Sequence, residues 1–329
     1  MNSKRILVPL AVAATLYGCG GGGGDNDPIA PDLTQITESN AQKSVGTVYR
    51  AGASLYDASY LSSDLAEDIA SLKSVPGERT SLVAFSVQRL DDMTRIAVAR
   101  DAADLSNGVA KKETSSETMA CSEGGTMTVT ADLQDPDRIS SGDRITGVFA
   151  SCVESGVRID GKMTIGDLAL GDRIAALFLF EDLRITDGAD AGQVDGAFHL
   201  SMPATFDHSR LVSIDLTRIS LRVAANGRTA TLQDVTSHAE IVFMTDEFRY
   251  TLQGRIADSG DGVSVDVTTE TPFAGVGPNL LEGALRIAGA ASSSARAIVS
   301  SPDHVTIEVD ADGNGTYEQT LDEVHVSAL

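Results

Sequence analysis

The stretch LVSIDLTRISLRV, residues 211–223, decides the fold class of this chain. Its apolar residues recur with a period of two and many are β-branched, which is typical of a strand with one buried face. The chain continues through two alanines to Asn226-Gly227, a dipeptide that is typical of a tight hairpin turn. The stretch therefore predicts a β-strand that reverses directly into an antiparallel neighbour.

The same pattern recurs along residues 107–329. Eleven further segments are rich in β-branched residues and are separated by Asp-Gly, Asn-Gly and Ser-Gly-Asp-Gly pairs, which mark hairpin turns. Asn226-Gly227 and residues 258–262 are the clearest of these turns. Because the connections are short, they favour an antiparallel meander over a parallel sheet. The segments are 126–133, 143–151, 162–170, 175–186, 196–202, 239–244, 248–256, 263–269, 283–289, 295–300 and 305–309.

A weak repeat accompanies these strands. Gly125, Gly161, Gly196 and Gly283 each open a stretch in which apolar residues alternate, and Ala239 begins a similar one. The repeat length is consistent with one hairpin per unit.

Residues 37–106 carry a helical pattern instead. Ser39 or Asn40 is placed to cap a first helix, and apolar residues recur at helical spacing from Tyr49 to Leu72. Pro76-Gly77 interrupts the pattern, and Thr80 is placed to cap a further amphipathic segment. These apolar stripes require a partner surface.

The predicted fold class is α+β, with the helical segment 37–106 packed on a large curled antiparallel β-sheet formed by residues 107–329. A sheet of ten or more strands seldom stays open and flat, so a β-meander of half-barrel or barrel-like shape is expected. In architecture alone, this arrangement resembles the half-barrel periplasmic carriers of lipoproteins and lipids.

The first residues have the form of an export signal. Lys4 and Arg5 precede an apolar run that ends at Tyr17, which is too short for a membrane span. Leu16-Tyr17-Gly18-Cys19 resembles the lipobox of bacterial lipoproteins, which implies cleavage after residue 18 and lipid on Cys19. In residues 19–36, five glycines follow Cys19, and this segment is expected to form a flexible tether. The alternative is an ordinary secretory signal in which the cysteine is accidental.

Composition excludes several partners. Removing residues 1–18 takes Lys4 and Arg5 from the 25 basic residues, so 23 cations face 47 anions, a net charge of −24. Such a chain repels nucleic-acid phosphates and anionic lipid surfaces. It has no tryptophan, which disfavours carbohydrate platforms and base stacking.

Two cysteines remain besides Cys19. Cys121 precedes one predicted strand and Cys152 ends the next, so both can lie at the same end of a hairpin. In an oxidising compartment this pair is expected to form a disulfide. A redox or metal role would favour CxxC spacing or neighbouring histidines, and the sequence has neither.

The sharpest local motif is VDADGNGTYE, residues 309–318. Asp310, Asp312 and Asn314 alternate before a glycine, as in the opening of an EF-hand loop, and Glu318 is placed to complete a calcium site. The twelfth position is Leu321 where a bidentate glutamate is expected, and strands flank the loop. The alternative is a tight acidic hairpin turn. Calcium is the one cofactor that the sequence offers.

Other signatures of catalysis are missing from the sequence. The five histidines, His199, His208, His238, His304 and His325, are scattered, and HExxH, GxSxG and Walker motifs are absent. We therefore expect a non-catalytic protein.

Several stretches together resemble proteobacterial outer-membrane lipoproteins of uncharacterised activity. They are LYGCGGGGGDND, ITESNAQKSVGTVYRAGASL, the C…GGTMTV…GDRITGVFASC hairpin and the terminal GALRIAG…VTIEVDADGNGTYE. The resemblance implies several acyl chains on Cys19 and sorting to the outer membrane, because Gly20 rather than aspartate follows the cysteine. The membrane contact would then be the anchor alone, with the body facing the periplasm or the cell exterior.

These observations leave three hypotheses for function. The first is an interaction or scaffold module of the envelope with a protein partner. The second is a carrier of a lipid or other apolar ligand in the concavity of the sheet. The third and weaker one is a hydrolase whose acidic residues are brought together by the fold.

Overall fold

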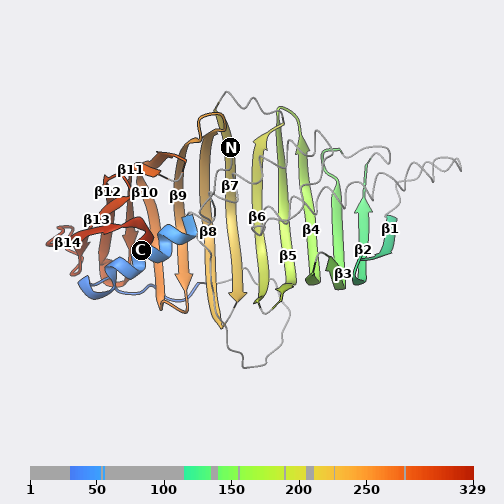
Figure 1. Cartoon of the computed structure of the whole chain (residues 1–329), viewed down its shortest axis with the longest axis horizontal. Helices are drawn as coiled ribbons and strands as arrows, with labels where there is room; N and C mark the ends of the chain where they lie inside the picture. The colour runs from blue at the N-terminus through green and yellow to red at the C-terminus, as the bar shows by residue number, and fades with distance from the viewer. Residues whose placement is uncertain are drawn as a thin grey trace, which may run out of the picture.

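The computed structural model describes residues 30–52, 55, 115–134, 140–154, 156–188, 190–204, 211–225, 227–277 and 279–329. In this part of the chain, fourteen strands form one antiparallel sheet (Figure 1). Each strand pairs with its neighbours in sequence, and the order is β1 to β14 without a crossover. The predicted α+β fold and β-meander are confirmed, and the sheet is open rather than closed.

The strands are longer than the sequence pattern indicated. Residues 211–223 lie in one of them, β7, and the eleven other predicted segments fall in β2–β6 and β8–β13. The strands are β1 (Ser115–Ala120), β2 (Gly124–Asp132), β3 (Arg144–Glu154), β4 (Val157–Leu170), β5 (Arg173–Asp187), β6 (Asp190–Pro203), β7 (Val212–Ala225), β8 (Arg228–Val242), β9 (Glu247–Asp258), β10 (Val263–Val276), β11 (Asn279–Ala288), β12 (Ser294–Ser301), β13 (His304–Asp310) and β14 (Gln319–His325).

One face of the sheet carries the core. Side chains alternate along the strands on either side of the register shifts, so alternate residues turn toward this face and many of them are buried. Phe178 on β5 stacks against Phe198 on β6 with their ring centroids 4.9 Å apart, and both rings are fully buried. Burial of such aromatic and aliphatic side chains is the main favourable contribution to the stability of the sheet.

A line of β-bulges crosses the sheet at mid-strand. Register shifts occur in every strand pair from β2–β3 to β10–β11. At Ser151, Asp182 and Asp234 the bulged residue has a φ of 50–52°. A bulge bends its strand and increases the local twist, so this line curves the whole sheet.

Glycines face these bulges, and they explain the weak repeat. Gly125, Gly161 and Gly196 lie opposite bulges on the next strand, where an added Cβ would come within 1.9–2.2 Å of a backbone oxygen. On β9, Gly254 rather than Ala239 faces a bulge, and this bulge lies on the preceding strand at Asp234 and Val235 of β8. The expectation that the glycines open strands is therefore wrong for Gly161, Gly196 and Gly283, which lie inside β4, β6 and β11.

Two Asp-Gly pairs consequently have a different role from the predicted one. Asp160-Gly161 and Asp195-Gly196 lie within strands, not at hairpin turns. Asp160 accepts a hydrogen bond from the amide of Ser151 at 2.6 Å, and Asp195 accepts one from the amide of Asp182 at 2.7 Å. Each aspartate thus satisfies a bulge on the preceding strand, while the glycine after it makes room for a bulge on the following strand.

One helix is described, over residues 38–52 with residue 55 also helical. Thr37 precedes it, and its amide donates to Oδ1 of Asn40 at 2.8 Å, which satisfies a backbone group at the helix start. Asn40 therefore lies in the first turn instead of before the helix. Three predicted features lie outside the described residues. They are the helical pattern beyond residue 55, the predicted signal peptide and the predicted lipid site at Cys19.

The helix packs on the C-terminal half of the sheet (Figure 1, blue). Its buried side chains include Ala41, Val45 and Val48, and Gly52 lies against Tyr250 and Leu252 of β9. Residues 30–36, the end of the predicted tether, also lie on the sheet, where Ile36 is fully buried.

A charged cluster fixes the helix to the β9–β10 turn. The carboxylate of Asp261 accepts hydrogen bonds from Thr47 at 2.9 Å, Arg50 at 2.7 Å and Arg228 at 2.8 Å, and Lys43 lies 4.0 Å away. Burial acts to raise the pKa of Asp261, but the Thr47 hydrogen bond and the three cations outweigh it, so the pKa lies below its ordinary value of 3.8.

Asp261→Asn is expected to lower the free energy of unfolding by about 2 kcal/mol near neutral pH, because two arginines lose a partly buried anion. Since the pKa is lowered in the folded state, this stabilisation is present above pH 3.8 and is lost as the pH falls through the folded value. Urea unfolding followed across pH 2–7 should show the difference between Asp261→Asn and the parent shrinking below pH 4. A constant difference would contradict this account.

Candidate functional site

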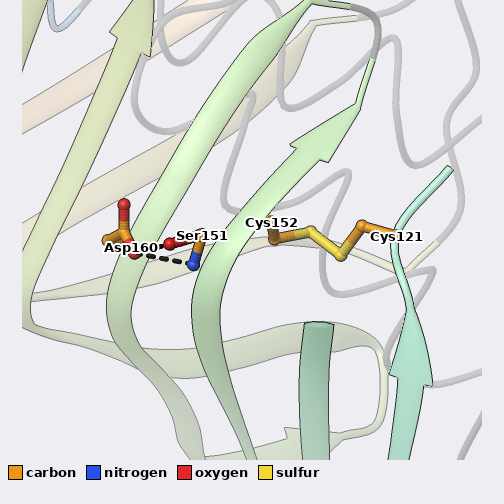
Figure 2. Close-up of a disulfide and its surroundings, with 4 residues drawn as sticks. All are labelled: Cys121, Ser151, Cys152 and Asp160. Atoms are coloured by element: carbon orange, nitrogen blue, oxygen red, sulfur yellow. Dashed lines mark hydrogen bonds between the residues drawn. A yellow bond between two sulfur atoms is a disulfide. The ribbon is translucent and has the colours of Figure 1, made fainter. Parts of the chain in front are cut away.

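Cys121 and Cys152 form a disulfide, as the sequence predicts (Figure 2). Cys121 follows β1, Cys152 lies on β3, and their Cα atoms are 5.4 Å apart. Both residues are buried, and the neighbouring bulge at Ser151 is held by Asp160. The bond joins the β1–β2 turn to β3 and so holds the outermost strand pair, which is a structural role.

The four residues of the predicted calcium site come together in the loop between β13 and β14. Carboxylate oxygens of Asp310, Asp312 and Glu318 all lie within 4.8 Å of one another. The amide nitrogen of Asn314 lies between two of these acids, 3.1 Å from Asp312 and 2.7 Å from Glu318. The side-chain amide of Asn314 therefore bridges Asp312 and Glu318.

Asp310 is the internal support of this loop. It is 2% exposed, and its two carboxylate oxygens accept hydrogen bonds from the amides of Gly313 at 2.8 Å, Asn314 at 3.1 Å and Gly315 at 3.0 Å. Three backbone donors satisfy this buried carboxylate without a metal. The geometry therefore accommodates the acidic-turn alternative fully, and calcium binding would require the Asn314 amide to rotate so that its oxygen faces the acids.

Calcium provides the test between these alternatives. If it binds, we expect saturating calcium to raise the melting temperature by about 5 °C. Asp312→Asn should abolish the rise, and Asp132→Asn, an acid-to-amide change at an exposed site on β2, should preserve it. The melting temperature is measured by differential scanning calorimetry with calcium and with a chelator. If neither changes it, the loop is an acidic turn and not a calcium site.

A histidine–carboxylate pair that sequence reasoning missed lies on the face opposite the core. Nδ1 of His238 on β8 is 2.6 Å from Asp215 on β7, and its Nε2 is 3.7 Å from Glu240. Arg173 of β5 donates to the other oxygen of Asp215 at 2.6 Å. Because carboxylates flank both ring nitrogens, this group is a charge network between strands and not a histidine poised beside a nucleophile.

A shallow groove of about 350 Å³ lies over the start of β9, the end of β10 and the start of β11. Its lining combines the Phe248 ring and Leu281 with two exposed acids, Glu247 and Glu282. Gly275 keeps the groove open, because an added Cβ would lie 2.6 Å from the Phe248 ring. The groove is a surface feature at one end of the sheet.

Within the described ranges, no helix has the length and hydropathy that crossing a membrane requires. No protein-family model matches the chain, and no curated protein or solved structure matches it either.

Proposed function

We propose that this chain is an envelope lipoprotein of the outer membrane that acts as a non-catalytic interaction module. The observation that carries the proposal is the open sheet, which buries one face and leaves the opposite face in contact with solvent along strands of up to 15 residues. An open sheet of this size offers a broad and stiff surface for a partner. The lipobox-like sequence at residues 16–19 supports the proposed location at the outer membrane.

The solvent face is strongly polar. Cross-strand ion pairs follow one another along it, including Lys162–Glu181 at 2.6 Å, Arg173–Asp215 at 2.6 Å and Arg255–Asp266 at 2.7 Å. The side chains in these three pairs remain 33–49% exposed. Exposed pairs of this kind contribute little to stability, but they set the charge pattern that a partner meets.

Cys19→Ser is expected to move the protein from the membrane fraction to the soluble periplasmic fraction, because a folded body without acyl chains has no stable anchor. The measurement is fractionation of cells that express the full chain, with mass analysis of the parent for the acyl groups. Gly22→Ser is the control, since it introduces a serine into the adjacent glycine run, keeps Cys19 and should leave the protein membrane-bound. A Cys19→Ser protein that stays with the membrane would refute the anchor.

The carrier hypothesis is the second candidate, and the groove beside Phe248 favours it because its volume of about 350 Å³ falls in the range of small-molecule sites. Solvent extraction of the purified full chain separates the two functions. An apolar molecule recovered in stoichiometric amount would favour the carrier, and a protein recovered by cross-linking in the envelope would favour the interaction module.

A further inference from the structure

Exposed apolar side chains gather at one end of the sheet. Six large hydrophobic residues are prominently exposed among the described residues, and five of them lie where the even-numbered strands end or the next strand begins. This set is called the apolar rim and consists of Leu170, Leu211, Met244, Val276 and Leu281, with exposures of 42%, 57%, 72%, 41% and 49%. The sixth, Val148, lies in the middle of β3.

The opposite end of the sheet has a different surface. Its turns, which follow β3, β5, β7, β9, β11 and β13, show no exposed large hydrophobic residue in the described ranges. Exposed apolar residues that cluster instead of scattering are typical of an interaction site.

Acidic residues accompany the apolar rim. Asp172, Asp246, Glu247 and Glu282 are exposed there, and none of their carboxylates forms an ion pair with a described residue. Arg144, Arg173 and Arg249 are exposed cations at the same end, and Arg173 is paired with Asp215. The four acids outnumber the other two arginines, so the rim has a net negative charge and attracts cationic groups, with the effect strongest at low salt.

The spacing of the rim fits an elongated partner. Neighbouring strands lie about 4.8 Å apart, so the successive hairpins β4–β5, β6–β7, β8–β9 and β10–β11 are roughly 10 Å apart along the rim. Seven residues of an α-helix span about 10.5 Å, so apolar side chains one heptad apart on a helix match this interval. The groove between Phe248 and Leu281 is wide enough to receive one such side chain.

We propose that the apolar rim, with its groove at Phe248 and Leu281, docks a cationic amphipathic segment of a partner protein. Apolar side chains of the segment contact the rim, and its lysines or arginines approach Glu247 and Glu282. The inference rests on the proposed interaction function and names the surface that performs it. An anionic lipid surface is disfavoured as the occupant, because the same acids repel it.

The test uses the full chain with Cys19→Ser, so that an anchor does not contribute, and a synthetic helical peptide of about 20 residues with leucines on one face and lysines on the other. Fluorescence anisotropy measures the Kd. Met244→Ser with Leu281→Ser is expected to raise the Kd roughly tenfold, because two apolar contacts are lost. Val148→Ser is the control, since it removes an exposed apolar residue away from the rim, and it should leave the Kd unchanged.

The charge arm uses Glu247→Gln with Glu282→Gln. The control is Glu117→Gln with Asp322→Asn, which removes two exposed acids inside β1 and β14, away from the rim. Only the rim pair should weaken binding, and its effect should fade at about 0.5 M salt. The proposal is overturned if the rim variants bind like the parent, if a glutamate version of the peptide binds equally well, or if the rim binds anionic vesicles instead. None of these results bears on the Cys19 fractionation, so failure here is distinguishable from failure of the proposed function.

Discussion

Gly161→Ala is expected to lower the free energy of unfolding by about 3 kcal/mol or more, a larger effect than most single substitutions produce. Gly161 has a φ of +111°, which side-chain-bearing residues rarely adopt, so alanine strains the backbone. An added Cβ would also lie 2.2 Å from the carbonyl oxygen of Asp182, a backbone atom that can move only if the bulge on β5 is rearranged. Both costs arise at the same position.

Two other glycines separate these costs. Gly188 has a φ of 58°, and no atom lies within 4 Å of an added Cβ. Gly188→Ala therefore carries the backbone cost alone and should lower the free energy of unfolding by about 1 kcal/mol. At Gly192 the nearest atoms are 3.7 Å from an added Cβ and no unusual φ is required, so its alanine variant should be close to neutral. Urea unfolding of the three variants measures the series. A Gly161→Ala midpoint equal to that of Gly192→Ala would refute the role of the bulge line.

Removing the disulfide is expected to cost roughly 3–4 kcal/mol in the chain-entropy account, because the bond closes a loop with a sequence separation of 31 residues. Cys121→Ala with Cys152→Ala should therefore unfold at a distinctly lower urea concentration than the oxidised parent. Without the disulfide, β1 should be the first strand to detach, because it pairs with β2 alone among the described strands.

The reduced parent is the control for this double variant. Reductant should shift the parent toward the unfolding midpoint of the double variant and leave the variant itself unmoved. If oxidised and reduced parent unfold at the same midpoint, the bond does not constrain the chain in the way that its position implies.

The interior strands could be predicted because each has enough alternating residues to define a buried face. β1, with the sequence SSETMA, could not, since it is short and polar as edge strands often are. β14 was anticipated only as the segment that follows the acidic loop. The sequence pattern also could not distinguish a closed sheet from an open one, because closure depends on accumulated twist and bulges rather than on any single strand.

The bulges left a signal that period-two reasoning passed over. Along β5 the buried residues are Ala176, Phe178 and Phe180, and then Leu183, so the alternation shifts by one residue at Glu181-Asp182. The Asp-Gly pairs were assigned to turns because turns and bulge partners both use the backbone freedom of glycine. A phase shift in burial, read together with a glycine on the preceding strand, would have separated the two cases.

The acidic loop could be predicted because its residues are local in sequence, and its spacing alone brings the acids together. The His238–Asp215 pair and the cluster around Asp261 could not. They join residues 23 and more than 200 positions apart, and their partners are set by strand register and helix docking. A shift of one residue in register would turn each of these side chains to the other face.

The connectivity of the sheet has a consequence for how the chain reaches its native state. Every strand pairs with a neighbour in sequence, so the meander can assemble progressively, one hairpin after another, as residues emerge during synthesis. The N-terminal helix is the exception, because Arg50 and Ile36 find Asp261 and Ser293 more than 200 residues later. The apolar face of the helix therefore stays exposed to solvent until the C-terminal half of the sheet has folded. A holding chaperone would be needed most during this interval.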